Sequence, residues 1–164
     1  MRSSTTRLLI LLLAVTIAAI IALQAHWLQK TYALEKNEFN TAIIKSIRGV
    51  YEDIALTNDA GTNLSALIEH PNPNSFLFRI DTIPLKDSLN YYFKNELEDF
   101  DVFTDCHLAV YDPKKDAFVY ETFLATTIPT GKSNTGTGLQ PIKKEYAYVY
   151  LFFPKRNSYI ISQM

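Results

Sequence analysis

Cysteine is almost absent from this chain of 164 residues, in which Cys106 is the only one. A single cysteine excludes an intrachain disulfide and a four-cysteine zinc cage. Excess positive charge is absent too, because 16 Lys and Arg face 17 Asp and Glu and leave a net charge of -1. Without a basic stripe or an Arg-rich helix to neutralise phosphates, we expect no nucleic acid partner.

Signatures of catalysis and metal binding are also missing. The GKS tripeptide at 131–133 lacks the glycine that a phosphate-binding loop places five residues earlier, and no Gly-x-Ser-x-Gly elbow occurs. Asp105, Cys106 and His107 are metal-ligand types, but on a strand Cys106 faces one side and its two neighbours face the other. We therefore predict no catalytic site, no metal and no cofactor, with Cys106 buried as a small hydrophobe.

The chain does contain a long apolar run, LLILLLAVTIAAIIALQAHW, from Leu8 to Trp27 without a charged residue. A helix over 8–28 would be roughly 30 Å long, which matches the hydrocarbon core of a bilayer. A cleaved signal peptide would have a shorter apolar core and small residues at both cleavage positions, whereas cuts after Ala22 or Ala25 each leave a large residue at one of them. A pilin-type stem would carry a glutamate that this run lacks. We predict a retained transmembrane helix, and a cleaved signal is the alternative.

Charge around the run predicts its orientation. Arg2 and Arg7 precede it, so the positive-inside rule places residues 1–7 in the cytoplasm and residues 29–164 outside the membrane. Trp27 then lies at the outer interface of the bilayer, where an indole ring is favoured. The lipid bilayer is thus the first predicted partner.

Residues 29–56 predict a long helix that continues the anchor, because no proline interrupts them and Gly49 is their only glycine. Apolar side chains recur at a spacing of three, four or seven, which forms one stripe of an amphipathic helix. Two interpretations stay open: the stripe packs against its own domain, or part of it pairs with a second copy as a homodimer stem. The predicted packing and signalling seam consists of Phe39, Ile43, Ile47 and Val50.

The remaining residues predict an α+β fold. A connector over 57–75, with a short helical piece around 64–68, is followed by a sheet with one helix over 76–164. The helix is expected over 84–99, and a polar loop over 126–141. The expected strands span 76–83, 102–111, 117–124, 145–153 and 158–162, the last four as an antiparallel meander. The prediction is a long helix packed on one face of an antiparallel sheet of about five strands.

A few polar residues are candidates for contacts with a ligand. Arg79, His107 and Tyr120 are predicted to lie near a pocket between the sheet and the helices. The acidic run of Glu96, Glu98, Asp99 and Asp101 is interpreted as a solvated helix end, with a divalent-cation or cationic-peptide contact as the alternative.

Three segments carry a family resemblance: ALQAHWLQKTYALEKNEFNTAIIKSI directly after the anchor, LKDSLNYYFKNELEDF before AVYD, and the closing YLFFPKRNSYIISQM. With them the chain resembles the N-terminal sensory part of Bacteroidetes-type membrane sensor histidine kinases over nearly its whole length. The resemblance implies a PAS-like extracytoplasmic domain between two membrane helices. The sequence ends at Met164, where the second membrane helix would begin, and contains no phosphoacceptor helix, Asn-box or ATP lid.

The resemblance implies a function as well. It makes the chain the sensor region of a two-component kinase in a bacterial inner membrane, with the N-terminus cytoplasmic and the main domain periplasmic. A homodimer through the membrane-proximal helix, an unknown small ligand or envelope protein, and a response regulator reached only through the missing kinase core are the implied partners. The alternative is a single-pass anchored interaction or assembly protein with no sensing role.

Overall fold

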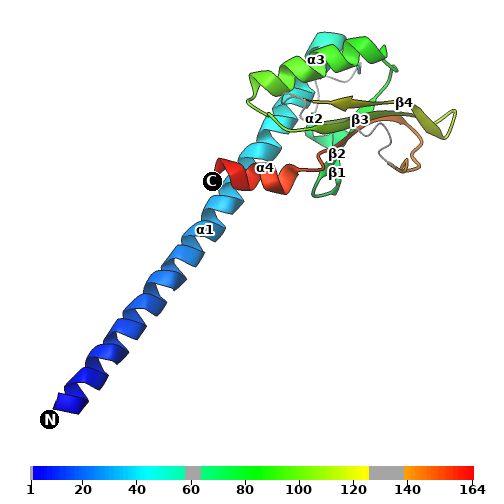
Figure 1. Ribbon diagram of the computed structural model, residues 1–164. Coiled ribbons are helices and arrows are strands. Elements are labelled where there is room, and N and C mark those ends of the chain that lie inside the picture. The colour runs from blue at the N-terminus through cyan, green and yellow to red at the C-terminus, as the bar shows by residue number, and fades with distance from the viewer. Residues whose placement is uncertain (1, 58–63, 126–138) are drawn as a thin grey trace.

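The computed structural model describes residues 2–57, 64–125 and 139–164. The GKS tripeptide, most of the predicted polar loop and residues 58–63 of the predicted connector lie outside these ranges. The first element, α1, is a single α-helix over Arg2–Ile54. Its unbroken course, visible in Figure 1, confirms that the apolar run continues into the amphipathic helix without a hinge.

Five strands form one antiparallel sheet, as predicted. They are β1 (Ile68–Asn72), β2 (Ser75–Ile80), β3 (Cys106–Asp112), β4 (Ala117–Leu124) and β5 (Ala147–Phe152). Three further helices are α2 (Leu64–Leu67), α3 (Lys86–Asp99) and α4 (Arg156–Gln163). The expected α+β class is confirmed, and α2 matches the short helical piece predicted there.

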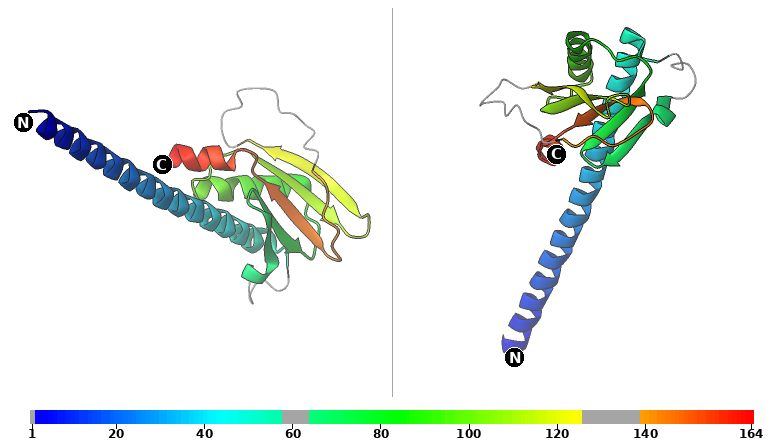
Figure 2. Two further views of the ribbon diagram at one scale, coloured as in Figure 1. Left: turned by 90° about the horizontal axis from the view of Figure 1, so that it is seen from below. Right: turned by 90° about the vertical axis from the view of Figure 1, so that its right-hand side faces the viewer.

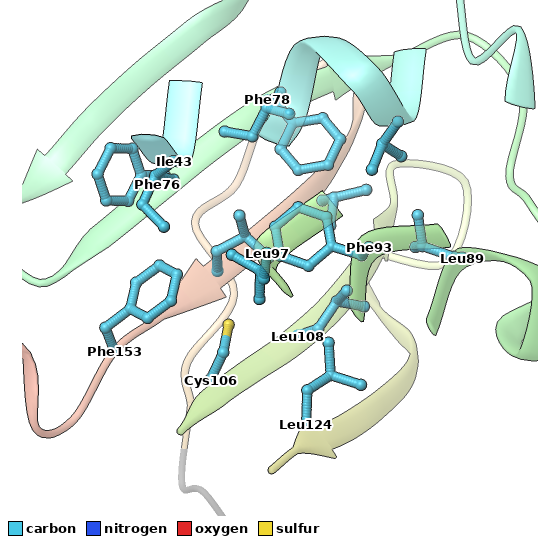
Figure 3. Packing of buried hydrophobic residues seen from close by; sticks show 14 of the residues in the cluster. Ile43, Phe76, Phe78, Leu89, Phe93, Leu97, Cys106, Leu108, Leu124 and Phe153 are labelled. Atoms are coloured by element: carbon cyan, nitrogen blue, oxygen red, sulfur yellow. The ribbon is translucent and has the colours of Figure 1, made fainter. Parts of the chain in front are cut away.

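The main core lies between the sheet and the helices. The C-terminal part of α1, together with α3 and α4, covers one face of the sheet, while the N-terminal part of α1 extends away from the domain (Figures 1 and 2). Figure 3 shows Ile43 of α1 and Phe93 and Leu97 of α3 meeting the aromatic rings of β2. Every second side chain of a strand points toward these helices, and every third or fourth side chain of a helix points toward the sheet. The core is built from these two sets of side chains.

The strand order β1-β2-β5-β3-β4 corrects the predicted meander. The predicted hairpin of β3 and β4 is present, but β5 pairs with β2 and β3 rather than with β4. The central position gives β5 a partner on both sides, and its buried run of Tyr148 to Leu151 suits a strand covered on both faces.

Two further predictions about elements are wrong. The last predicted strand, 158–162, belongs to helix α4, because Arg156 and Ile160 point into the core at helical spacing. The residue types Tyr, Ile and Ile favoured a strand, but the contact with α1 decided the outcome. In contrast, β1 forms inside the predicted connector; Pro71 is tolerated because β1 is an edge strand.

Strand β3 begins four residues later than predicted, because the preceding segment caps α3. The Val102 N–H donates to the Leu97 carbonyl at 2.8 Å and the Asp101 N–H to the Glu98 carbonyl at 3.1 Å. This is the Schellman pair of hydrogen bonds, with Asp101 in the left-handed region at φ 57°. Val102 is buried beside Leu97, which fixes how the chain leaves the helix.

Candidate functional site

Helix α1 has two zones with opposite surroundings. An 18-residue window near its N-terminus has a mean hydropathy of 2.8 and no buried residue. Leu8, Leu23 and Trp27 are each more than 60% exposed. Among the described residues this is the one helix long and apolar enough to cross a membrane. The other zone packs against the core from Tyr32 onward, and Phe39 is its first buried residue.

The predicted seam of α1 lies inside the chain's own domain. Phe39 is 5% exposed, and Ile43, Ile47 and Val50 are fully buried. The packing interpretation of the stripe is therefore right. A homodimer formed through α1 would have to use the other side of the helix, where Leu34 is 56% and Ile44 37% exposed.

The C-terminal end of α1 is tied to the end of β2. The Tyr51 hydroxyl donates to the Arg79 carbonyl, and the Asp81 N–H donates to the Leu56 carbonyl at 2.9 Å. The Thr57 hydroxyl adds a hydrogen bond of 2.8 Å to the Asp81 carboxylate. These bonds couple the last turn of α1 directly to the sheet.

Helix α3 crosses α1 where α1 carries small residues. The Ser46 hydroxyl lies 3.0 Å from the Ala42 carbonyl and 3.1 Å from the Glu96 carbonyl of α3. One turn later, a Cβ atom on Gly49 would lie 2.0 Å from the Glu96 carboxylate. The two helices therefore meet with a side chain of α3 lying directly on the backbone of α1.

Helix α4 also joins the sheet to α1 (Figure 1). Arg156 is 2% exposed; its guanidinium donates to the Asn40 side chain at 3.0 Å and lies 5.4 Å from the Phe39 ring centroid. Burial lowers the pKa of Arg156. The Tyr159 hydroxyl donates to the Asp101 carbonyl at 2.7 Å, which connects α4 to the end of α3. Because β5 leads into α4, the central strand is connected to α1 through these contacts.

The three predicted ligand residues do not line one pocket. The Arg79 guanidinium lies 3.6 Å from the Asp81 carboxylate and 5.5 Å from the Tyr146 ring centroid, on the sheet face away from the helices. The His107 ring shares that face and lies 4.8 Å from the Phe123 ring, where burial lowers the pKa of His107.

Tyr120 packs on the opposite, helix-covered face, and its hydroxyl donates to the Pro84 carbonyl at 3.1 Å. Burial raises the pKa of Tyr120 to about 12. Arg79 pairs with Tyr148 and His107 with Phe152 of the same strand, so the two residues on one face are offset by roughly 13 Å along the strand direction and also lie on opposite sides of β5. The alternation of side chains along β4 shows that Tyr120 faces the helices only once the register between β3 and β4 is known.

The sheet face away from the helices carries a second, smaller core. Tyr111 and Tyr148 stack with ring centroids 4.6 Å apart. The Tyr148 hydroxyl donates to the Ile142 carbonyl and accepts from the Ile142 N–H, both at 2.8 Å. Nearby, Tyr146 and Lys144 both donate to the Glu69 carboxylate and lower its pKa.

Shallow hollows lie at both ends of the domain. One of 290 Å³ lies between α1, the end of α3 and α4, and borders another of 440 Å³ that shares Glu38 and Asp101 with it. A third, of 460 Å³, lies at the ends of β2 and β3 and is lined by Asp81, Asp112 and Lys114 among others. None of these three hollows is lined by Arg79, His107 or Tyr120.

Metal ligands and a reactive thiol are equally hard to find in the described ranges. In residues 2–57, 64–125 and 139–164 no three His, Cys, Asp or Glu side chains are placed to hold a metal ion. Cys106 is fully buried in the main core, which confirms its interpretation as a small hydrophobe, and burial raises the pKa of its thiol.

Comparison with known proteins finds no family model, no curated protein and no solved structure that matches this chain. Its function is therefore inferred from its own geometry.

Proposed function

We propose that this chain is the membrane-anchored, extracytoplasmic sensor region of a two-component histidine kinase, with a PAS-like domain. In this proposal residues 8–28 span a bacterial inner membrane, residues 1–7 are cytoplasmic and the domain is periplasmic. Arg2 and Arg7 before the apolar run support this orientation. An envelope signal or a small ligand acts on the domain, and a homodimer passes the change to a kinase core.

One observation carries the proposal: α1 is a single helix whose exposed apolar part and buried amphipathic part are continuous. A hydrogen-bonded helix moves as a rod, so a shift at Ile43 or Ile47 would move the apolar segment with it. Signalling transitions commonly use helix displacements of about 1–2 Å between two packed states. The domain therefore has a direct mechanical connection to the membrane.

The position of α4 supports the same proposal. The central strand β5 leads into α4, and α4 packs on α1 through Arg156 and Tyr159. Both ends of the described chain thus lie on α1 or against it, as Figure 1 shows. A change in the sheet would act on α1 through α3 and through α4 together.

Cysteine labelling tests the anchor and its orientation. The full chain is expressed with Ser3→Cys or Lys36→Cys and treated in spheroplasts with a membrane-impermeant maleimide; native Cys106 is buried and serves as the unlabelled background. We expect labelling of Lys36→Cys in intact spheroplasts and of Ser3→Cys only after lysis. Labelling of Ser3→Cys before lysis, or a mature N-terminus beyond Ala25, would refute the proposal.

The coding sequence after Met164 is read first. An in-frame apolar helix and a kinase core there support the sensor, whereas a stop codon favours an anchored interaction protein.

Signalling is tested by changing the phase of α1. In the complete kinase, one residue inserted between Leu28 and Gln29 rotates the helix by about 100°, and seven residues restore its phase to within about 20°. We expect only the single insertion to change basal autophosphorylation. Equal activity of both insertions and the parent would show that α1 does not carry the signal.

A further inference from the structure

The Glu96 side chain occupies an unusual place at the crossing of α1 and α3. Its carboxylate lies on the Gly49 backbone, so closely that a Cβ there would be 2.0 Å from Oε2 and 2.5 Å from Oε1. The sequence placed Glu96 in a solvated acidic run, but its side chain is partly buried between the two helices. The contact exists because residue 49 is a glycine.

The backbone around Glu96 is held against α1. The Ser46 hydroxyl lies 3.1 Å from the Glu96 carbonyl oxygen, and Phe93 and Leu97 on either side of it are fully buried. The backbone of Glu96 is therefore fixed beside α1, and its carboxylate reaches Gly49 from that position.

The charged groups that face Glu96 are mostly acidic. Burial raises the pKa of Glu96, and Asp53, Asp99 and Glu52 raise it further, from both α1 and α3. None of the ion pairs formed within the described ranges includes Glu96.

The basic groups near the crossing have other partners. Arg48 pairs with Glu52 at 2.9 Å, and Lys94 pairs with Glu98 at 3.7 Å. The Lys45 ammonium lies 5.8 Å from the Phe100 ring centroid. The carboxylate of Glu96 is thus surrounded by like charge in the seam between two packed helices.

We propose that Glu96 makes the contact between α1 and α3 responsive to acid: protonation of its carboxyl group tightens the seam at Gly49, and ionisation loosens it. This acid-responsive contact would act on α1, the same helix that contains the apolar run. The contact itself can be tested without any kinase, and only its role in signalling rests on the proposed function.

The direction of the pH effect follows from linkage. An acid whose pKa is higher in the folded than in the unfolded chain stabilises the fold progressively as the pH falls through the folded pKa, and opposes folding when ionised above it. His70 and His107 act in the opposite direction, because burial lowers the pKa of each and their protonation opposes folding. The difference between wild type and Glu96→Gln removes the histidine contribution.

Thermal unfolding of the full chain in detergent micelles, at pH 7 and at pH 4.5, tests the proposal. At pH 7 we expect Glu96→Gln to melt about 3 °C above wild type, a shift typical of a small change in stability for a domain of this size. At pH 4.5 the difference should shrink by half or more. Glu98→Gln is the matched control, because it removes a carboxylate of the same helix that is paired and more exposed.

Two results would overturn the proposal: a difference between Glu96→Gln and wild type that is the same at both pH values, or an equal response of Glu98→Gln. Hydrogen exchange provides a second readout, in which amides of 45–53 should be better protected at pH 4.5 in wild type only, after correction for intrinsic rates. A chain that shows these effects but fails the insertion test keeps the acid-responsive contact and loses only its signalling role.

Discussion

Three non-glycine residues next to helix or strand ends have a backbone in the left-handed region. Ala55, Asp101 and Asp116 have φ values of 49°, 57° and 51°. Asp is comparatively well tolerated in this region, whereas an alanine Cβ collides with the following carbonyl oxygen. Ala55 follows the last residue of α1, at a position where glycine is the commonest choice.

We predict that Ala55→Gly stabilises the domain by about 0.5–1 kcal/mol, because glycine removes the steric cost of the left-handed conformation. The control is Ala42→Gly, which lies inside the packed part of α1 and should destabilise by about 1 kcal/mol. Urea unfolding of the full chain in micelles measures both. Loss of stability in Ala55→Gly would show that the end of α1 does not adopt this conformation.

A second residue-scale prediction concerns the buried guanidinium of Arg156. Asn40→Ala should cost about 1.5–3 kcal/mol, because it removes the side-chain oxygen that accepts from the buried, charged guanidinium of Arg156. Arg156→Met keeps the apolar stem of the side chain over Phe39 and removes the charge, so it should cost less than Asn40→Ala. Unfolding of the two variants and of their combination measures the coupling. A larger loss in Arg156→Met would contradict this account of the contact.

At the scale of elements, the burial of each residue in the C-terminal part of α1 depends on whether it lies on the face of the helix that meets the sheet. Neighbouring residues have opposite surroundings: Ile43 is fully buried, and Ile44 is 37% exposed. Local periodicity predicted this stripe correctly, because every turn of a helix repeats the same direction. The strands β3, β4 and β5 and the helix α3 were predicted for the same reason, since each contains its own periodic signal.

We predict that Ile43→Ala destabilises the domain by about 2–5 kcal/mol, since it removes methyl groups from the core and leaves a cavity. The same substitution at Ile44 should change the free energy of unfolding by less than about 0.5 kcal/mol in the monomer. Thermal or urea unfolding compares the two. Equal losses at both positions would mean that the second side of α1 is also packed, as in a dimer through α1.

At the scale of the whole molecule, the domain and the apolar segment are joined by one helix and share no core. The main cluster draws on α1 only from Tyr32 onward. The apolar side chains of residues 8–28 are exposed along the helix, and Figure 2 shows that part of α1 standing clear of the sheet. The apolar segment can thus move with the domain without contributing to its stability.

We predict that the domain folds without the apolar segment. A protease site placed between Gln29 and Lys30 should release a soluble fragment whose melting temperature lies within about 2 °C of the uncleaved chain, because the severed helix makes no contact with the core. Circular dichroism before and after cleavage measures this. A fragment without a cooperative transition would show that the apolar segment helps to hold the domain together.

The sequence by itself determined the local features: the unbroken course of α1, its buried stripe, the α+β class and most of the strand positions. Each follows from a periodicity or a turn signal within about twenty consecutive residues. Only the tertiary structure decided the central place of β5, the edge strand β1, the helical state of α4 and the meeting of Glu96 with Gly49. These depend on pairings between segments far apart in the chain, where contact with a distant partner outweighs local preference.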